Sequence, residues 1–459
     1  GCAAGPDFVS PAVPAFTHYT AAAPLSVTSD EGAVTQVLRA GDAVPHGWWQ
    51  AFGSPELDDL VDTALAGNAT LESARATLAQ AQHVLGGVRG TRYPRIDVAA
   101  SAGRANGARA GGQGGVADSF TLGPSLKLDT DAFGATRRRI EQAQALADYQ
   151  SAQWQAAQLS LSGNTVLQAI ALAGAREQLA AVRDILAVDQ RNLDLVQLAA
   201  AAGKSARLDV LTAESQLDSD RALLPPLEQQ AAVARHALAV LAGKAVAQWS
   251  PPEFDVQAFS LPPDLPLVLP SRLVRRRPDI LAAQAQLHAA SAAIGIAAAQ
   301  LYPDIALSAS WTASAATAGG LLNGGSLWSL AASLVAPIFD AGTLAAQRDA
   351  AVDAYAAQLG AYRQTVLQAF GQVADTLEAL QHDAALLEAQ GKALDTALAV
   401  LELTRQSYQA GQASLLQLLE AQRQYQQARL GHARAQGQRL AGTGQWFIVM
   451  GGAQLDLQE

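Results

Sequence analysis

Cysteine is almost absent from this sequence, with Cys2 as its one example in 459 residues, so an intrachain disulfide is excluded. The single methionine and the seven scattered histidines supply no spacing typical of a metal site. The sequence also lacks a phosphate-binding loop and a nucleophile elbow. It therefore predicts neither an enzyme nor a protein with a bound cofactor or metal.

Charged residues are scarce as well, at 16%, and aromatic residues reach 5%, both low for a soluble globular protein. The net charge of −10 argues against a nucleic-acid partner, because a polyanion requires a basic surface. Two runs of three arginines, 137–139 and 275–277, are expected to form ion pairs or to lie near a membrane edge. No signal peptide is recognisable, so we expect a mature chain.

What the sequence does contain is an internal repeat. Tyr93-Pro94-Arg95-Ile96 returns as Tyr302-Pro303-Asp304-Ile305, and Gly203-Lys204-Ser205 returns as Gly411-Gln412-Ala413. The offsets between these stretches are 209 and 208 residues. Landmarks in the same order at a nearly constant long offset indicate a duplicated structural unit that makes up half of the protein.

Each half contains a segment in which apolar and polar residues alternate, which is the period of a β-strand. We expect β-hairpins at about 94–130 and 303–338, with strands of about 9–11 residues joined by glycine-rich loops, as in membrane β-barrels. The stretch 305–339 has no charged residue and would pass for a transmembrane helix on hydropathy. Its glycine pairs and its small polar residues at every second position argue against that helix.

The alternation gives each hairpin an apolar face and a polar face. We expect the polar face to line a water-filled lumen and to tune its ion selectivity, the alternative being that it merely keeps the pore wet. The predicted lumen-lining residues are Asp97, Ser101, Lys127, Asp129, Ser308, Ser310 and Thr312.

A long helical hairpin follows each β-hairpin, at about 135–240 and 343–440, and turns at Gly203 or Gly411. Small and apolar residues from Ala145 to Ala173 recur at alternating spacings of four and three, a period typical of coiled-coil packing. Each long helix is about 100 Å long at 1.5 Å per residue. Pro225 and Pro226 are expected to break the returning helix of the first hairpin.

Five segments follow from these patterns. They are an extended strap (1–47), a first repeat (48–244), a proline-rich linker (245–270), a second repeat (271–440) and a C-terminal tail (441–459). Four membrane strands cannot close a barrel, and an open sheet in lipid leaves unpaired backbone groups that cost several kcal/mol each. The chain is therefore expected to share its barrel with identical copies, and three copies supply twelve strands.

Several stretches resemble the TolC-like family of outer membrane efflux proteins, in its lipoprotein branch of OprM- or NodT-like proteins, over almost the whole chain. The stretches are Gly5-Pro6-Asp7-Phe8, Trp48-Trp49, 65–71, 129–134, Pro225-Pro226-Leu227, 276–280, 294–299, 337–342 and Tyr408-Gln409-Ala410-Gly411. The most specific are Arg277-Pro278-Asp279-Ile280 and Pro337-Ile338-Phe339-Asp340.

The resemblance implies a mixed α and β membrane protein, with a trimeric 12-stranded β-barrel in the outer membrane of a Gram-negative bacterium. A long periplasmic α-helical barrel continues it, and the short helices, strap, linker and tail form an equatorial region. The implied function is the exit duct of a tripartite efflux system for drugs or small toxic solutes. The implied partners are a periplasmic adaptor protein and an inner-membrane pump of the resistance–nodulation–division type.

Cys2 follows Gly1 as in the end of a lipobox, and the resemblance implies that Cys2 carries lipid in the outer membrane. Because cysteine is the first residue of a mature lipoprotein, Gly1 is in this interpretation either the last signal residue or a numbering choice. The alternative is that Cys2 is a free terminal thiol.

The helix turns are expected at the periplasmic tip. There Asp209, Glu420 and Arg423 are candidates for salt bridges between hairpins that keep the tip closed, or else they are solvated surface charges. The candidates for adaptor contact are Gly203, Lys204, Ser205, Gly411, Gln412 and Ala413. Ordinary helix-turn chemistry would also explain these residues.

Two other functions stay open from the sequence. One is an exit duct for type I protein secretion or for metal-ion efflux. The other is a lipid-tethered periplasmic coiled-coil scaffold, although such a scaffold would not need the apolar face of the two β-hairpins.

Overall fold

The computed structural model describes residues 3–20, 26–27, 36–107, 115–323 and 325–452, which form two compact units. The first, which we call the sheet unit, contains Gly1–Ala12, Ala76–Ala152 and Leu281–Thr365. The second, the core unit, contains Val13–Arg75, Gln153–Ile280 and Val366–Glu459. Each unit draws on both sequence repeats, because each repeat sends its strands to one unit and its helix turns to the other.

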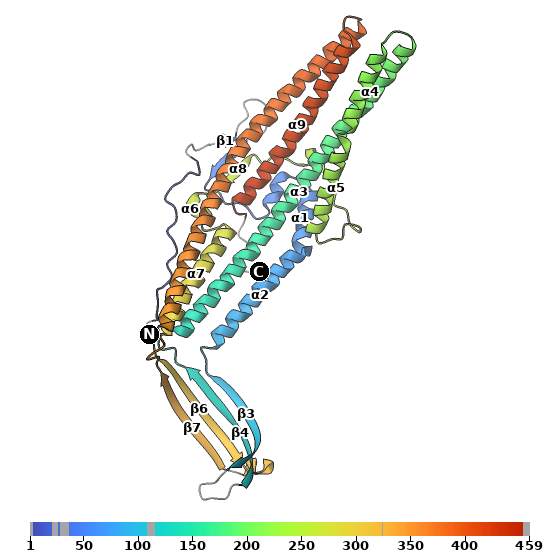
Figure 1. Cartoon of the computed structure of the whole chain (residues 1–459). Helices are drawn as coiled ribbons and strands as arrows, with labels where there is room; N and C mark the ends of the chain where they lie inside the picture. Colours follow the sequence, from blue (N-terminus) through green and yellow to red (C-terminus); the bar gives the residue numbers. More distant parts are fainter. Residues whose placement is uncertain (1–2, 21–25, 28–35, 108–114, 324, 453–459) are drawn as a thin grey trace. The chain divides into compact units, whose positions relative to one another are not determined.

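The sheet unit contains one four-stranded antiparallel sheet in the order β3-β4-β6-β7 (Figure 1). Its strands are β3 (Arg95–Gly107), β4 (Gly115–Asp129), β6 (Asp304–Ala315) and β7 (Gly325–Val335). Strands β3, β4 and β6, at 12 to 15 residues, exceed the expected 9–11, because pairing continues into the loop segments, and β7 has 11 residues. The stretch 305–339 contains strands, so the rejection of a transmembrane helix there is confirmed.

Helix lengths repeat between the two halves of the chain. Helices α2 (Ala69–Gly90) and α7 (Pro278–Ala299) have 22 residues each. Helices α3 (Ala135–Ala201) and α8 (Thr343–Gln409) have 67 residues each. The duplication that the sequence indicates is therefore present in the helices.

An aspartate lies before each long helix and caps it. The backbone N–H of Thr136 donates to Asp131 Oδ1 at 2.6 Å, and that of Leu344 donates to Asp340 Oδ2 at 2.7 Å. A carboxylate at this position accepts from backbone N–H groups that have no partner inside the helix. The same device thus starts both long helices.

Helix α7 is the one helix in the described part of the chain that is long and apolar enough to cross a membrane. Half of its most apolar window is buried inside the protein, which is typical of a core helix.

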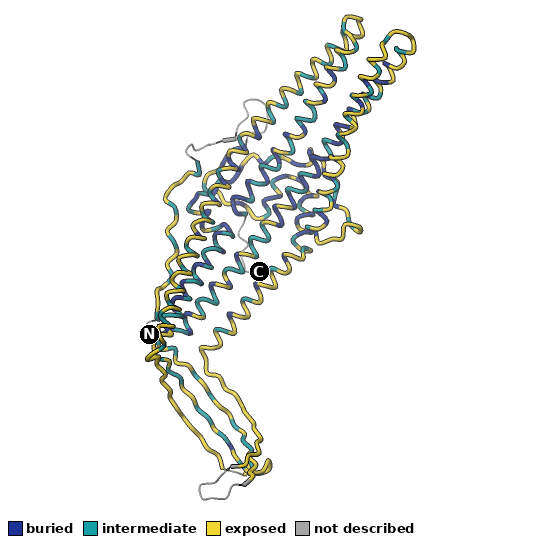
Figure 2. The backbone as a smooth tube through the Cα atoms, viewed as in Figure 1, coloured by how far each residue is buried: buried dark blue, intermediate teal, exposed yellow. Residues whose placement is uncertain are grey.

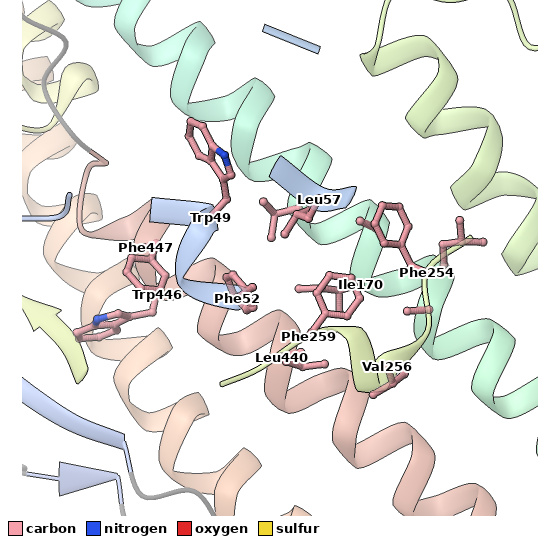
Figure 3. Close-up of a cluster of buried hydrophobic side chains, with 14 of the residues drawn as sticks. Trp49, Phe52, Leu57, Ile170, Phe254, Val256, Phe259, Leu440, Trp446 and Phe447 are labelled. Carbon is pink, nitrogen blue, oxygen red and sulfur yellow. The ribbon is translucent and has the colours of Figure 1, made fainter. Parts of the chain in front are cut away.

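The core unit holds the main hydrophobic core, part of which Figure 3 shows. Its aromatic side chains come from η1 (Trp48–Phe52), from Phe254 and Phe259, and from the end of α9 (Leu415–Val449). Trp48 stacks on Phe447 with ring centroids 5.2 Å apart. The remaining helices of this unit are α1 (Pro55–Gly67), α4 (Arg207–Arg221), α5 (Leu224–Leu241), η2 (Val256–Ala258) and α6 (Pro270–Leu273). Helix η3 (Ala318–Leu322) lies in the sheet unit, between β6 and β7.

Two expected boundaries differ from the structure. Helix α9 continues to Val449, beyond the expected end at 440, because Trp446 and Phe447 extend its apolar face into the core. The proline-rich linker 245–270 contains strand β5 (Asp264–Leu267), which pairs in parallel with β2 (Gln36–Ala40) from the expected strap. Strand β1 (Ser26–Val27) pairs with β2 and completes a three-stranded sheet.

Two helical hairpins project from this core within the same unit (Figure 1). The first returns through α4 and α5, which are separated at Ala222 and Leu223, just before Pro225. The second returns through α9 without a break. The expected interruption by the proline pair therefore occurs in the first hairpin and not in the second.

Candidate functional site

The strand register places all seven predicted lumen residues on one face of the sheet. Lys127 lies opposite Arg95 on one side and Ser308 on the other, and Ser310 lies opposite Ser329. Residues directly opposite each other in a sheet share a face, and that face alternates along each strand. The hydroxyls of Ser101 and Thr121 hydrogen-bond across this face at 2.7 Å.

The opposite face of the sheet is apolar and exposed. Trp311 and Trp328 face each other across β6 and β7, and Leu330, Ile96 and Val98 are at least two-thirds exposed. Figure 2 shows that β3 and β7, the edge strands, are exposed along their described length. An apolar surface of this kind is typical of lipid contact.

The neighbouring strands β4 and β6 approach each other closely at Gly123. Gly123 lies against the backbone of Trp311 and Thr312, and a Cβ atom on Gly123 would overlap the Trp311 carbonyl oxygen. Pro124, the next residue, has no N–H to donate to the ladder. Glycine is required here because only a residue without a side chain lets the two strands approach this closely.

The two helix turns share one backbone conformation. Gly203 has φ of 73° and Gly411 has φ of 72°, a region that residues with a Cβ atom rarely adopt. The N–H of Lys204 donates to the Ala199 carbonyl, and that of Gln412 donates to the Ser407 carbonyl, each at 2.8 Å. This arrangement is the usual glycine-terminated helix end.

The six candidate adaptor residues all lie at these turns. Gly203, Lys204, Gly411 and Gln412 are exposed, and Ser205 and Ala413 are half-buried. Their exposure leaves them accessible, and a role in adaptor contact stays a prediction.

The candidate gate residues contact their own helices rather than the neighbouring hairpin. Arg423 donates to both carboxylate oxygens of Glu420, at 2.6 and 3.0 Å, across one turn of α9. Asp209 caps α4 and accepts from the Ser205 hydroxyl at 2.7 Å and from the Ala206 N–H at 3.0 Å. The expected salt bridges between hairpins are therefore not made by these three residues within the described chain. The reason is that residues three apart on a helix already lie within reach of one another.

Hydrogen bonds shift the pKa values of Asp209, Glu420 and Arg423. The Arg423 guanidinium lowers the pKa of Glu420, and Glu420 in turn raises the pKa of Arg423. Hydrogen bonds from Ser205 and the Ala206 N–H lower the pKa of Asp209. All three groups are therefore charged at neutral pH.

The contacts that do join the two hairpins come from residues that the sequence analysis did not single out. Asn192 on α3 donates to Gln422 on α9 at 2.9 Å. Asp189, one turn earlier on α3, is 6% exposed and lines the same cavity as Gln426 on α9. Asp189 follows Ile185 in the buried stripe of α3, and a carboxyl at an apolar position is the signal that could have revealed this buried position.

Cys2 lies outside the described residues. The first part of the strap, residues 4–8, makes several contacts within the sheet unit. The Arg138 guanidinium donates to Asp7 and Glu141 at 2.7 Å each and to the carbonyl oxygens of Ala4 and Gly5. Phe8 stacks on His288 with ring centroids 4.3 Å apart. Arg138 and His288 therefore hold residues 4–8 of the strap in place.

Comparison with known proteins gives a consistent result. The model of the outer membrane efflux protein family matches residues 60–244 and 269–442. The pyoverdine export outer membrane protein OpmQ of Pseudomonas aeruginosa is 34% identical over 426 residues, or 90% of this chain and 88% of OpmQ. The probable outer membrane lipoprotein SilC of Salmonella typhimurium is 28% identical and covers 82% of this chain and 81% of SilC.

Among solved structures, that of the outer-membrane channel OprN superposes with a TM-score of 0.89. It is 28% identical and covers 98% of this chain and 99% of OprN. The sheet with one apolar and one polar face and the paired helical hairpins are thus those of an outer membrane channel. The chain belongs to the outer membrane efflux protein family and is an efflux channel of the outer membrane.

Proposed function

We propose that three copies of this chain form the exit duct of a tripartite efflux system, with the polar sheet faces lining the pore. The observation that carries this proposal is the pair of free edges on β3 and β7, which nothing in the described chain covers. Unpaired strand edges are not tolerated in lipid, so each edge requires a partner strand from a neighbouring copy.

The helix turns are the part of the channel that meets the periplasmic adaptor in this proposal. Gly203 and Gly411 present two similar exposed turns, one from each repeat. The adaptor connects the duct to an inner-membrane pump of the resistance–nodulation–division type. OpmQ, a pyoverdine export protein by name, supports small organic solutes as the class of cargo.

A lipid on Cys2 completes the membrane attachment. SilC is named as a lipoprotein, and the strap next to Cys2 is fixed by Arg138 in this chain. Incorporation of labelled palmitate, and its loss in Cys2→Ala, tests this attachment.

Glu420 and Arg423 act in this proposal as a gate at the closed tip. Their ion pair lies within one exposed helix turn, where such a pair alone stabilises little. The gate therefore requires that the three copies bring their ion pairs together around one axis. Each charge then also interacts with the opposite charges on the neighbouring copies.

Planar-bilayer recordings test the gate. The variants Glu420→Ala and Arg423→Ala are expected to raise single-channel conductance severalfold and to sensitise cells to large antibiotics. The matched control removes the i,i+4 ion pair of α8 between the half-buried Glu388 and the exposed Lys392, which lies away from the turn, and should leave conductance unchanged. Unchanged conductance in both gate variants would contradict the role of this pair.

A further inference from the structure

A cavity of about 140 Å³ lies inside the core unit, next to the aromatic side chains of η1. Its wall is built mainly from η1, one side of α3, the start of α7 and the residues that follow α9. Trp48 and Leu159 contribute apolar surface to this wall. An engineered protein cavity of about 150 Å³ binds benzene, so a benzene ring with a small substituent is the size of molecule that fits here.

Three residues of the wall carry a buried polar atom that has no hydrogen-bond partner in the described chain. These atoms are the indole Nε1 of Trp49 and the carbonyl oxygens Oε1 of Gln155 and Gln158. Trp49 is only 7% exposed. The described residues have five such atoms, and three of them belong to this one wall. Because buried polar atoms nearly always have a partner, we expect the missing partner to enter the cavity.

The local structure explains why these three groups meet. Gln155 and Gln158 are three residues apart on α3 and therefore lie on the same side of this helix. Trp49 comes from η1, which lies beside α3 (Figure 3), and it lines the same cavity. An indole N–H can only donate a hydrogen bond, and a glutamine carbonyl oxygen can only accept one. A single partner must therefore offer an acceptor and donors together.

The charges of the wall narrow the choice of ligand further. Arg276 and His46 are its titratable residues, and no carboxylate is among the described residues that line it. The Arg276 side chain makes no hydrogen bond or ion pair with the described residues. A cationic ligand would be repelled by Arg276, and a carboxylate ligand has no donor for Gln155 and Gln158. A neutral ligand satisfies all of these groups, because a guanidinium also interacts favourably with an aromatic ring.

We propose that this cavity is a binding site for a small neutral molecule with an apolar ring and a carboxamide group. The carboxamide oxygen accepts from Trp49 Nε1, and the carboxamide N–H groups donate to Oε1 of Gln155 and Gln158. The ring fills the apolar part of the cavity, against Trp48 and Leu159. None of these residues belongs to the helix turns or to the membrane sheet, so the site goes beyond the proposed duct and gate.

The second repeat provides an internal comparison. The long helices α3 and α8 correspond at an offset of 208 residues, which matches Gln155 to Arg363 and Gln158 to Val366. The repeated helix thus forms without a glutamine at either position. The two glutamines are therefore not a requirement of the repeated fold, which favours a role in binding.

Titration of the detergent-purified protein with 4-fluorobenzamide, followed by ¹⁹F NMR, tests the inference. We expect saturable binding of one molecule per chain at millimolar concentration or below. The analogues 4-fluorotoluene and 4-fluorobenzoate should bind at least about tenfold more weakly, because the first lacks polar groups and the second lacks donors. Absence of 4-fluorobenzamide binding overturns the site. Equal binding of 4-fluorotoluene, or tighter binding of 4-fluorobenzoate, overturns the assignment to a carboxamide.

Three variants each remove one polar group of the wall and keep an apolar side chain of similar shape. They are Trp49→Phe, Gln155→Met and Gln158→Met, and each should weaken 4-fluorobenzamide binding about tenfold. The affinity for 4-fluorotoluene should stay nearly the same, a difference that a folding defect would not produce. The matched control is Gln153→Met, which changes an exposed glutamine of α3 outside the wall and should bind like the wild type. Unchanged affinity in all three wall variants overturns the proposal.

The end of the chain is the alternative occupant that the test must separate from a free ligand. Residues 453–459 follow directly on Gly452, which lines the cavity. A variant that ends at Gly452 should bind 4-fluorobenzamide like the full chain. Binding that occurs only in the shortened variant would assign the cavity to the chain itself and overturn the ligand site. None of these experiments measures conductance, so failure of this site and failure of the proposed duct or gate are distinguishable.

Discussion

In the two triple-arginine runs, one arginine is buried and its two neighbours are exposed or half-buried. The buried arginines are Arg138 in the sheet unit and Arg277 in the core unit. Arg277 donates to both carboxylate oxygens of Asp279, at 2.8 and 3.0 Å, and to the Val449 carbonyl. The expectation of ion pairs is confirmed, and burial is possible because each guanidinium finds both a carboxylate and backbone carbonyls.

Replacement of Arg138 by alanine should release the strap. The change removes four hydrogen-bonded contacts and is expected to destabilise the docked strap by about 1–3 kcal/mol. Chymotrypsin should then cut after Phe8 severalfold faster than in the wild type. The neighbouring Arg139 is exposed, so Arg139→Ala is the matched control. Equal cleavage of all three proteins would show that Arg138 does not hold the strap.

At this scale the sequence identified charges but not their partners. Glu420 and Arg423 were expected, with Asp209, to form salt bridges between hairpins, yet they pair with each other, and a contact between the hairpins is made by Asn192 and Gln422 instead. Linear spacing reveals contacts within a helix, whereas contacts between hairpins depend on how two helices are rotated about their axes. That rotation is fixed by the whole core and is not visible in one helix.

Among the elements, the strands were the most predictable, because alternation of apolar and polar residues fixes the face of every side chain. The large apolar exceptions are Leu327 and Val335, which lie opposite Thr312 and Asp304 on the otherwise polar face. The pairing of β2 with β5 was not foreseen, because two short strands more than 200 residues apart carry no local signal of each other.

The close approach of β4 and β6 at Gly123 should not tolerate even a methyl side chain. Gly123→Ala is expected to force the two strands apart and to cost about 1–3 kcal/mol, since the added carbon meets backbone atoms that cannot rotate away. The measurement is the fraction of protein that runs as a heat-modifiable folded species on gels. Gly325→Ala is the control, since nothing lies within 4 Å of its added carbon. Equal yields from both variants would show that the close approach is unimportant.

For the molecule as a whole, the free edges of β3 and β7 make a single copy incomplete in lipid. Cysteines introduced as Ser101→Cys on β3 and Ser329→Cys on β7 should crosslink neighbouring copies into a covalent trimer, once nearby positions are scanned for register. Either cysteine alone should give no trimer. Detergent-purified wild-type protein should have the mass of three chains, and a stable monomer would refute the shared barrel.

The break between α4 and α5 distinguishes the two arms of each copy mechanically. One arm has a joint at Ala222 and Leu223, whereas α9 is a continuous rod. A break in the helical hydrogen-bond ladder lowers the bending stiffness of a helix, so a load on the turns is expected to bend the first arm at Ala222 and Leu223 before it bends α9. Although the two arms arose from one duplicated unit, a ring of such copies would therefore alternate between interrupted and continuous helices.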